Sequence, residues 1–226
     1  MAKSERQQSM RTFYFYLILL CMSLYLTGCA EKNSIESINS QTSEWTAKLS
    51  EAGELEIDLN MDEQADYISL ANVNMEGSQL ISKFEVAIAG CANNFIIENY
   101  DASFEKLELF DFDGDGLEEL IIMFDTHGGG GQGTHDIYVL WLKDTCIEAH
   151  KLDTLVELTI DVDASYNIDG VYSFEKVLYN GQEKLLVRQY MWGEEGHADM
   201  IGDMVSIVTL SKDRTQFVAE ESWIQK

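Results

Sequence analysis

The chain has 226 residues, and its 40 Asp and Glu against 15 Lys and Arg give a formal net charge of −25 at pH 7. This acidity argues against a nucleic-acid partner, because phosphate binding needs a basic face, and against adhesion to anionic lipid through a basic patch. The length suits one domain with a proper core, and the absence of Pro leaves the turns to Gly, Asn and Asp.

The N-terminal residues 1–28 have the pattern of a secretory signal peptide. Lys3, Arg6 and Arg11 precede an apolar run from Thr12 to Leu26. The run is shorter than the roughly 20 residues that a permanent transmembrane helix needs, and small residues follow it. We therefore expect a removable export signal rather than a membrane span.

The segment Leu26-Thr27-Gly28-Cys29 ends this signal and resembles the lipobox of bacterial lipoproteins. In that family the Cys thiol receives a diacylglycerol and a peptidase cuts directly before the Cys. The resemblance implies that Cys29 is lipidated and becomes the first residue of the mature protein. The chain would then be held on the outer side of a cytoplasmic membrane, since two or more acyl chains give stable anchoring.

Two further cysteines remain once Cys21 has left with the signal and Cys29 carries lipid. Outside the cytoplasm, Cys91 and Cys146 are candidates for a disulfide. The sequence does not fix the distance between them, so a disulfide and two free thiols both stay open.

Residues 29–53 are rich in Ser, Asn, Gln and Glu, so we expect the lipidated Cys29 to be followed by a flexible tether. From 54 to 226, short runs of β-branched, aromatic and alternating residues predict one mainly β domain of antiparallel hairpins. In chain order these runs are 55–59, 84–88, 107–110, 120–124, 137–142, 155–160, 171–178, 185–187, 205–210 and 217–223. A helix is the alternative over 78–93, but the alternation of Phe84, Val86 and Ile88 favours a strand.

An internal repeat accompanies these strands. Asp58–Ile68 aligns without a gap on Asp111–Ile121, an offset of 53 residues from 58 to 111, and 180–187 aligns more weakly on 115–122. Ser-Phe-Glu-Lys precedes the last two copies, at 103–106 and 173–176, and a Gly-rich connection follows each, at 128–133 and 193–196. A recurring hairpin of this kind predicts either a propeller-like partial array or a β-sandwich.

The segment Asp111–Glu119 has carboxylates at every second position from 111 to 115, followed by Gly116 and two glutamates. Such carboxylates repel one another unless a cation lies between them. Ca²⁺ suits this pattern because it takes six to eight oxygen ligands in irregular geometry. The expected ligands are the side chains of Asp111, Asp113, Asp115 and Glu119 and the backbone carbonyl of Leu117.

This loop differs from the helical EF-hand, because the strand-like run 120–124 follows it and its twelfth position is Ile122. It resembles the calcium loops of FG-GAP and VCBS-type repeats in integrin-like propellers, where an Asp-rich loop leads into an apolar strand. The earlier copy has Met61 and Glu63 in place of the two glycines. A second, weaker calcium site is expected there, formed by Asp58, Asn60, Asp62 and Asp66.

We therefore expect a lipid-anchored, extracytoplasmic calcium-binding domain with a binding or structural role, in contact with wall polymer, glycan or a surface protein. The sequence predicts no catalytic set. One alternative is an extracellular hydrolase that uses His127 and His135, beside the Gly-rich hairpin, with Asp125 or Asp136.

A second alternative is the solute-binding lipoprotein of a transporter, which the length and the lack of alternating strands and helices oppose. Trp141, Tyr190 and Trp192 are candidates for an aromatic patch that contacts carbohydrate or peptide.

Overall fold

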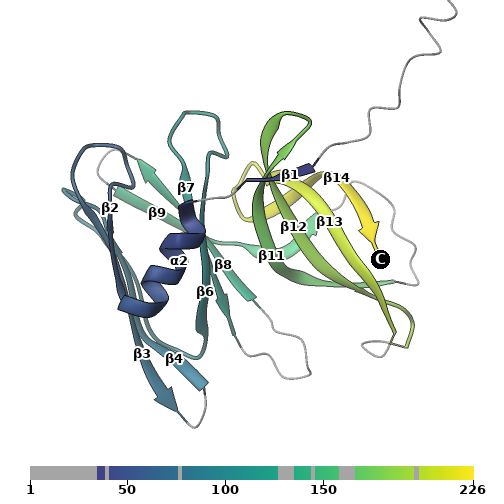
Figure 1. Ribbon diagram of the computed structural model, residues 1–226, viewed down its shortest axis with the longest axis horizontal. Coiled ribbons are helices and arrows are strands. Elements are labelled where there is room, and N and C mark those ends of the chain that lie inside the picture. The colour runs from purple at the N-terminus through teal and green to yellow at the C-terminus, as the bar shows by residue number, and fades with distance from the viewer. Residues whose placement is uncertain are drawn as a thin grey trace, which may run out of the picture.

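The computed structural model describes residues 35–38, 41–75, 78–126, 135–143, 146–157, 166–195 and 199–226. Over these residues the protein is mainly β, with antiparallel sheets and one helix (Figure 1). The predicted fold class is confirmed at this level. The expected signal peptide and Cys29 lie outside the described residues. None of the helical structure described is long and apolar enough to cross a membrane.

Three four-stranded antiparallel meanders follow one another along the chain. The first sheet contains β2 (Glu54–Ile57), β3 (Asp66–Met75), β4 (Ser78–Ala87) and β5 (Phe95–Tyr100) in that order. The middle sheet contains β6 (Ser103–Phe110), β7 (Glu119–Asp125), β8 (His135–Lys143) and β9 (Cys146–Lys151). The last sheet contains β11 (Asn167–Tyr179), β12 (Gln182–Trp192), β13 (Met200–Leu210) and β14 (Gln216–Gln225).

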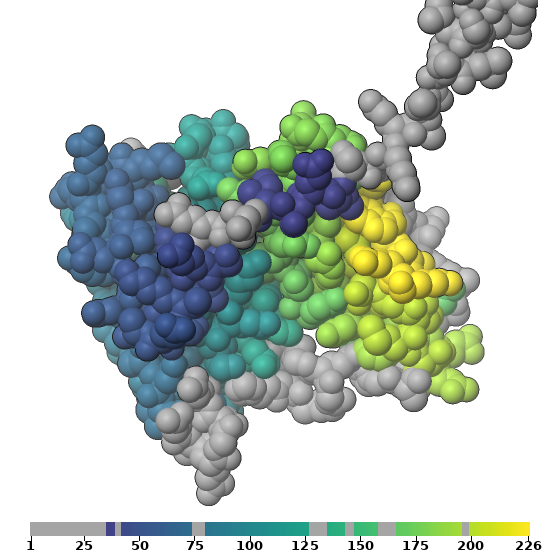
Figure 2. Space-filling model, viewed as in Figure 1, coloured from purple at the N-terminus to yellow at the C-terminus, as the bar shows by residue number. Residues whose placement is uncertain are grey.

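Two short strands extend the last sheet to six. β1 (Ile35–Ser37) pairs antiparallel with β11, and β10 (Asp153–Glu157) pairs parallel with β14. The three sheets adjoin one another in chain order across the molecule (Figure 2).

The middle sheet lies between two hydrophobic cores. Along β7, Leu120, Ile122 and Phe124 belong to the core shared with the first sheet, whereas Ile121 and Met123 belong to the core shared with the last sheet. A continuous apolar run is typical of a strand buried on both faces. Each such side chain contributes roughly 1.5–3 kcal/mol to folding, so the middle sheet joins the other two firmly.

The prediction that residues 29–53 form a flexible tether is wrong for most of the residues in this range that the structure describes. Ile35–Ser37 form β1, and Gln41–Ala52 form the helix α2, which packs on the first and middle sheets. Trp45 and Leu49 are four residues apart and so share one face of the helix; Leu49 is fully buried. Polar residues surround this pair in the sequence, so the composition of the segment did not indicate a helix with an apolar face.

Hydrogen bonds fix both ends of α2. The hydroxyl of Thr42 donates to the buried carboxylate of Glu108, and the backbone N–H of Leu107 donates to the Thr46 hydroxyl at 3.2 Å. At the other end Gly53 has φ +76° and its N–H donates to the Leu49 carbonyl at 2.9 Å. This positive-φ glycine is a common helix C-cap.

Cys91 is a free cysteine whose thiol donates to the carbonyl of Asn93 at 3.0 Å. The disulfide considered between Cys91 and Cys146 is therefore not formed in this structure.

Candidate metal centre

The loop that connects β6 to β7 holds the strongest cluster of potential metal ligands among the described residues. Phe110 pairs with Glu119 as the last register pair of the hairpin. Within the loop, the ring of Phe112 lies 4.9 Å from that of Phe110 and 6.4 Å from that of Phe217 in β14. The acidic loop is thereby anchored between the middle and last sheets.

Asp111, Asp113 and Asp115 each place one carboxylate oxygen within 4.8 Å of the others. Asp111 is half-buried and the other two are exposed. Three carboxylates this close repel one another, and a hard cation with oxygen ligands relieves that repulsion. The absence of His or Cys from the cluster suits Ca²⁺ better than Zn²⁺.

The backbone of the loop turns toward Asp111. Gly114 and Gly116 have φ values of +73° and +88°, and their N–H groups donate to the two Asp111 oxygens at 2.7 and 3.0 Å. The N–H of Leu117 donates to Asp115 at 3.0 Å. Both glycines adopt a left-handed conformation that L-residues with a Cβ disfavour.

Glu119 lies at the base of the loop with 2 % of its surface exposed. Its carboxylate accepts a hydrogen bond from the Phe112 N–H at 2.8 Å. Burial, aided by the nearby charges of Asp111, Asp113 and Asp115, outweighs this hydrogen bond and raises the pKa of Glu119 to about 7. Three of the five expected ligands are thus brought together in one cluster, with Glu119 beneath them and Leu117 beside Asp115.

Arg214 is a contact of the loop that the sequence did not predict. It lies in the turn between β13 and β14, where Nη2 is 3.7 Å from Asp113 Oδ2 and Nη1 is 3.6 Å from Glu148. Its guanidinium lies over the Trp141 ring, 4.5 Å from the centroid. No local signal marks this residue, because the contact joins distant parts of the chain.

The loop between β2 and β3 repeats this geometry at the positions that the 53-residue offset aligns. Met61 and Glu63 have φ values of +59° and +65°, where the other loop has its two glycines. The Glu63 N–H donates to Asp58 at 2.9 Å, and the Gln64 N–H donates to Asp62 at 2.8 Å. These hydrogen bonds correspond to those that the N–H groups of Gly116 and Leu117 donate in the loop between β6 and β7.

The second loop is less suited to a cation. The side-chain amides of Asn60 and Gln64 donate to the Asp62 carboxylate at 3.1 and 3.2 Å, a position where an ion would otherwise bind. The buried Asp66, which aligns with Glu119, accepts from the N–H groups of Leu59 and Ala89 at 2.8 and 2.7 Å, whereas Glu119 accepts from that of Phe112.

Of the residues considered for a hydrolase, the structure describes Asp125, His135 and Asp136, and Asp125 lies opposite His135 in the register of β7 and β8. His127 lies outside the described residues. His135 Nε2 is 3.0 Å from Glu105, and Asp136 accepts hydrogen bonds from Lys151 and Tyr100.

The aromatic patch differs from the prediction in two of its three members, because Trp141 and Trp192 are both buried. Trp141 is 1 % exposed and belongs to the core between the middle and last sheets, so it cannot contact a ligand at the surface. Tyr190 stacks on Tyr172 at 3.9 Å and lies 5.8 Å from Trp192, whose indole N–H donates to Asp169.

Comparisons with protein-family models, with curated proteins and with solved structures give no match to this chain.

Proposed function

We propose that this protein is a lipid-anchored, extracytoplasmic calcium-binding β domain with a binding or structural role at the cell surface. The observation that carries the proposal is the cluster of Asp111, Asp113 and Asp115 oxygens within 4.8 Å in a glycine-shaped loop. The lipobox-like segment that ends at Cys29 supports the anchored location.

The role proposed for the ion is structural. Phe112 ties the loop to Phe217 of the last sheet, so an ion bound by Asp111, Asp113 and Asp115 would stiffen the junction between two sheets. An ion enclosed by carboxylates at such a junction stabilises a fold and leaves no coordination position for a substrate. The partner of the domain would be a wall polymer, a glycan or a surface protein, bound elsewhere on the molecule.

The proposal also interprets the three meanders as units of a propeller-like partial array rather than as a two-sheet sandwich. Support comes from the hydrogen bonds shared by the two acidic loops and from the equal place of each loop, between the first two strands of its sheet. In the last sheet the corresponding connection is the tight turn of Asn180 and Gly181, with φ values of +52° and +77°.

Calcium titration of the protein, followed by calorimetry and thermal melting, tests the calcium site. We expect one ion to bind and the free energy of unfolding to rise, by about 2.7 kcal/mol at a Ca²⁺ concentration one hundred times the Kd. The double variant Asp113→Asn, Asp115→Asn should lose both effects.

The matched control is Glu98→Gln, Asp101→Asn, which removes two exposed carboxylates away from the loop. It should behave as wild type. Absence of binding at millimolar Ca²⁺, the weak limit for extracellular sites, would overturn the proposal.

A further inference from the structure

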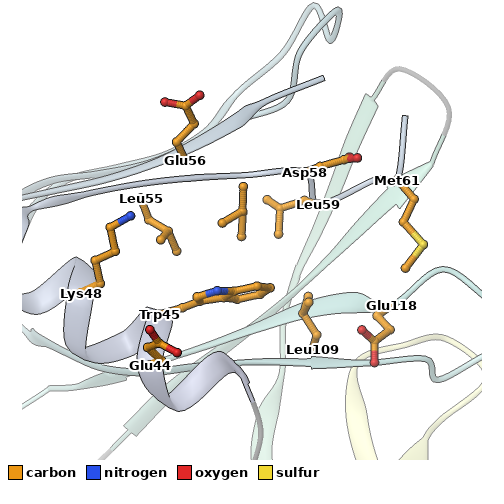
Figure 3. Close-up of a pocket in the computed structure, with 11 residues that line it drawn as sticks. Glu44, Trp45, Lys48, Leu55, Glu56, Asp58, Leu59, Met61, Leu109 and Glu118 are labelled. Atoms are coloured by element: carbon orange, nitrogen blue, oxygen red, sulfur yellow. The ribbon is translucent and has the colours of Figure 1, made fainter. Parts of the chain in front are cut away.

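A cleft of about 570 Å³ has α2 on one side and β2, with the loop that follows β2, on the other (Figure 3). This volume is in the range of sites for small organic ligands. Leu109 near the end of β6 and Glu118 of the acidic loop 111–119 border it, so one rim is formed by the loop 58–65 and another by the acidic loop.

The interior of the cleft is apolar. Trp45 from α2 extends its indole across the cleft, and Leu55 and Leu59 of the opposite chain segment point toward it (Figure 3). Met61 reaches in at the far end and is 63 % exposed. An indole beside aliphatic side chains suits an aliphatic chain, and the indole face attracts cations more strongly than other aromatic rings do.

The rim of the cleft is acidic. Glu44, Asp58 and Glu118 bring carboxylates to it, against the ammonium group of Lys48, whereas the Glu56 side chain points to the other side of β2 (Figure 3). Glu118 is paired with Lys176. Glu44 forms no ion pair within the part of the chain that the structure describes, so its charge is available to an incoming group. The net charge of −25 raises the local concentration of cations further.

We infer that this cleft binds a small organic cation, an alkylammonium or guanidinium group carried on a short aliphatic chain. The chain lies along the exposed side of the Trp45 indole, and the cationic head is held by the indole face and the Glu44 carboxylate. The inference deepens the binding role proposed above by naming the chemistry of its ligand. It does not depend on whether Ca²⁺ occupies the acidic loop.

Calorimetric titration of the full chain in non-ionic detergent tests the inference with three probes of equal length. We expect pentane-1,5-diamine to bind, and pentane-1,5-diol and glutarate to bind at least tenfold more weakly. A short peptide with one lysine carries the same head group. If the peptide binds as tightly as the diamine, the natural source is a lysine of a partner protein, whereas binding of the diamine alone indicates a free amine.

Substitutions at the rim test whether binding depends on this cleft or only on the overall acidity of the protein. Glu44→Gln should weaken diamine binding about fivefold and Lys48→Gln should strengthen it about threefold, as expected for partly exposed charges. Glu51→Gln makes the same charge change on an exposed position of α2 that does not line the cleft, and should leave the affinity unchanged. Trp45→Leu keeps an apolar filling but removes the indole, and should weaken binding about fivefold.

Equal binding of the diol or of glutarate would overturn the inference, as would an unchanged affinity in both Glu44→Gln and Lys48→Gln. Calcium titration of the same variants keeps the two proposals apart. Glu44→Gln should bind Ca²⁺ as wild type does, so loss of one kind of binding without the other identifies which proposal has failed.

Discussion

The guanidinium of Arg214 and the carboxylate of Asp113 lie 3.7 Å apart, and this contact connects the β13–β14 turn with the acidic loop of the middle sheet. Arg214 is thus a cation placed beside one of the three clustered aspartates. It partly offsets their repulsion, and a bound Ca²⁺ would have to share Asp113 with it.

Replacing Arg214 by Gln should therefore tighten calcium binding. Both side chains are about one-third exposed, at 32 % each, so solvent screens the pair and its energy is about 0.2–1 kcal/mol. That energy corresponds to a Kd roughly 1.4- to 5-fold lower, measurable by calorimetry. Arg188→Gln, which removes an arginine paired with Glu175 instead, is the control and should leave the Kd unchanged. Weaker binding in Arg214→Gln would mean that Arg214 positions Asp113 rather than competing at it.

The pKa of Glu119, raised to about 7 mainly by burial, predicts a pH-dependent stability of the calcium-free protein. Because the folded-state pKa lies above the ordinary value of 4.5, the folded state favours the protonated form. The contribution is fully present below about pH 4.5 and is lost as the pH rises through 7. Glu119→Gln keeps an acceptor for the Phe112 N–H, and above pH 7 it should be more stable than wild type by about 3 kcal/mol.

Melting temperatures in chelator, measured from pH 5 to pH 8, check this expectation. The wild-type curve should fall over this range relative to that of Glu119→Gln. Parallel curves for the two proteins would show that Glu119 keeps its ordinary pKa in the folded state.

The equivalence of the two acidic loops predicts that a second ion site can be made. Asn60→Asp, Met61→Gly and Glu63→Gly together give the β2–β3 loop the aspartate and glycine pattern of the other loop. The two glycines take positions whose φ values are already +59° and +65°, so the backbone needs no rearrangement. Calorimetry should then give two bound Ca²⁺ ions per chain in place of one. A stoichiometry of one would show that the engaged oxygens of Asp66 prevent closure of the second site.

The helix α2 should behave as part of the folded domain. Leu49 is fully buried in the core between the first and middle sheets, so Leu49→Ala should lower the free energy of unfolding by about 2–5 kcal/mol. Urea denaturation measures this, with Glu51→Ala as an exposed control in the same helix that should change little. A loss below 1 kcal/mol would indicate that the helix contributes little to the core.

Cys29 should determine how the protein is attached to the membrane. Cys29→Ser removes the thiol that would carry the acyl chains, so the variant should not incorporate labelled fatty acid and should leave the membrane fraction on carbonate washing. Cys91→Ser is the control, since Cys91 is a free cysteine within the folded domain. Unchanged labelling of Cys29→Ser would disprove lipidation at this residue.

Much of the β structure could be predicted from local sequence. The predicted runs fall within strands wherever the structure describes them, apart from one or two terminal residues. The strands that were missed have physical reasons. β3 carries polar residues such as Asn72 and contains a register shift between Ala71 and Asn72, which breaks the alternation. β5 and β9 are edge strands with no buried side chain among those described, so their sequences carry no core pattern.

The candidate site, too, was predictable from the sequence only in part. Asp111, Asp113 and Asp115 are close because a short loop holds them, and the sequence alone predicted that cluster. The contact of Arg214 with Asp113 comes from the packing of the last sheet on the middle one, which no local pattern encodes. The role of Asp66 as a buried acceptor of two backbone N–H groups likewise depends on where β4 ends.

The pairing of β1 with β11 places Ile35 opposite Tyr179, and β1 is the described strand nearest in sequence to Cys29. If Cys29 carries the acyl chains, the chain from Cys29 to Ile35 spans at most about 20 Å when fully extended. The edge of the last sheet would then stay within that distance of the lipid headgroups. A protein anchored in this way would meet wall polymer, glycan or a surface protein only where these reach the membrane surface.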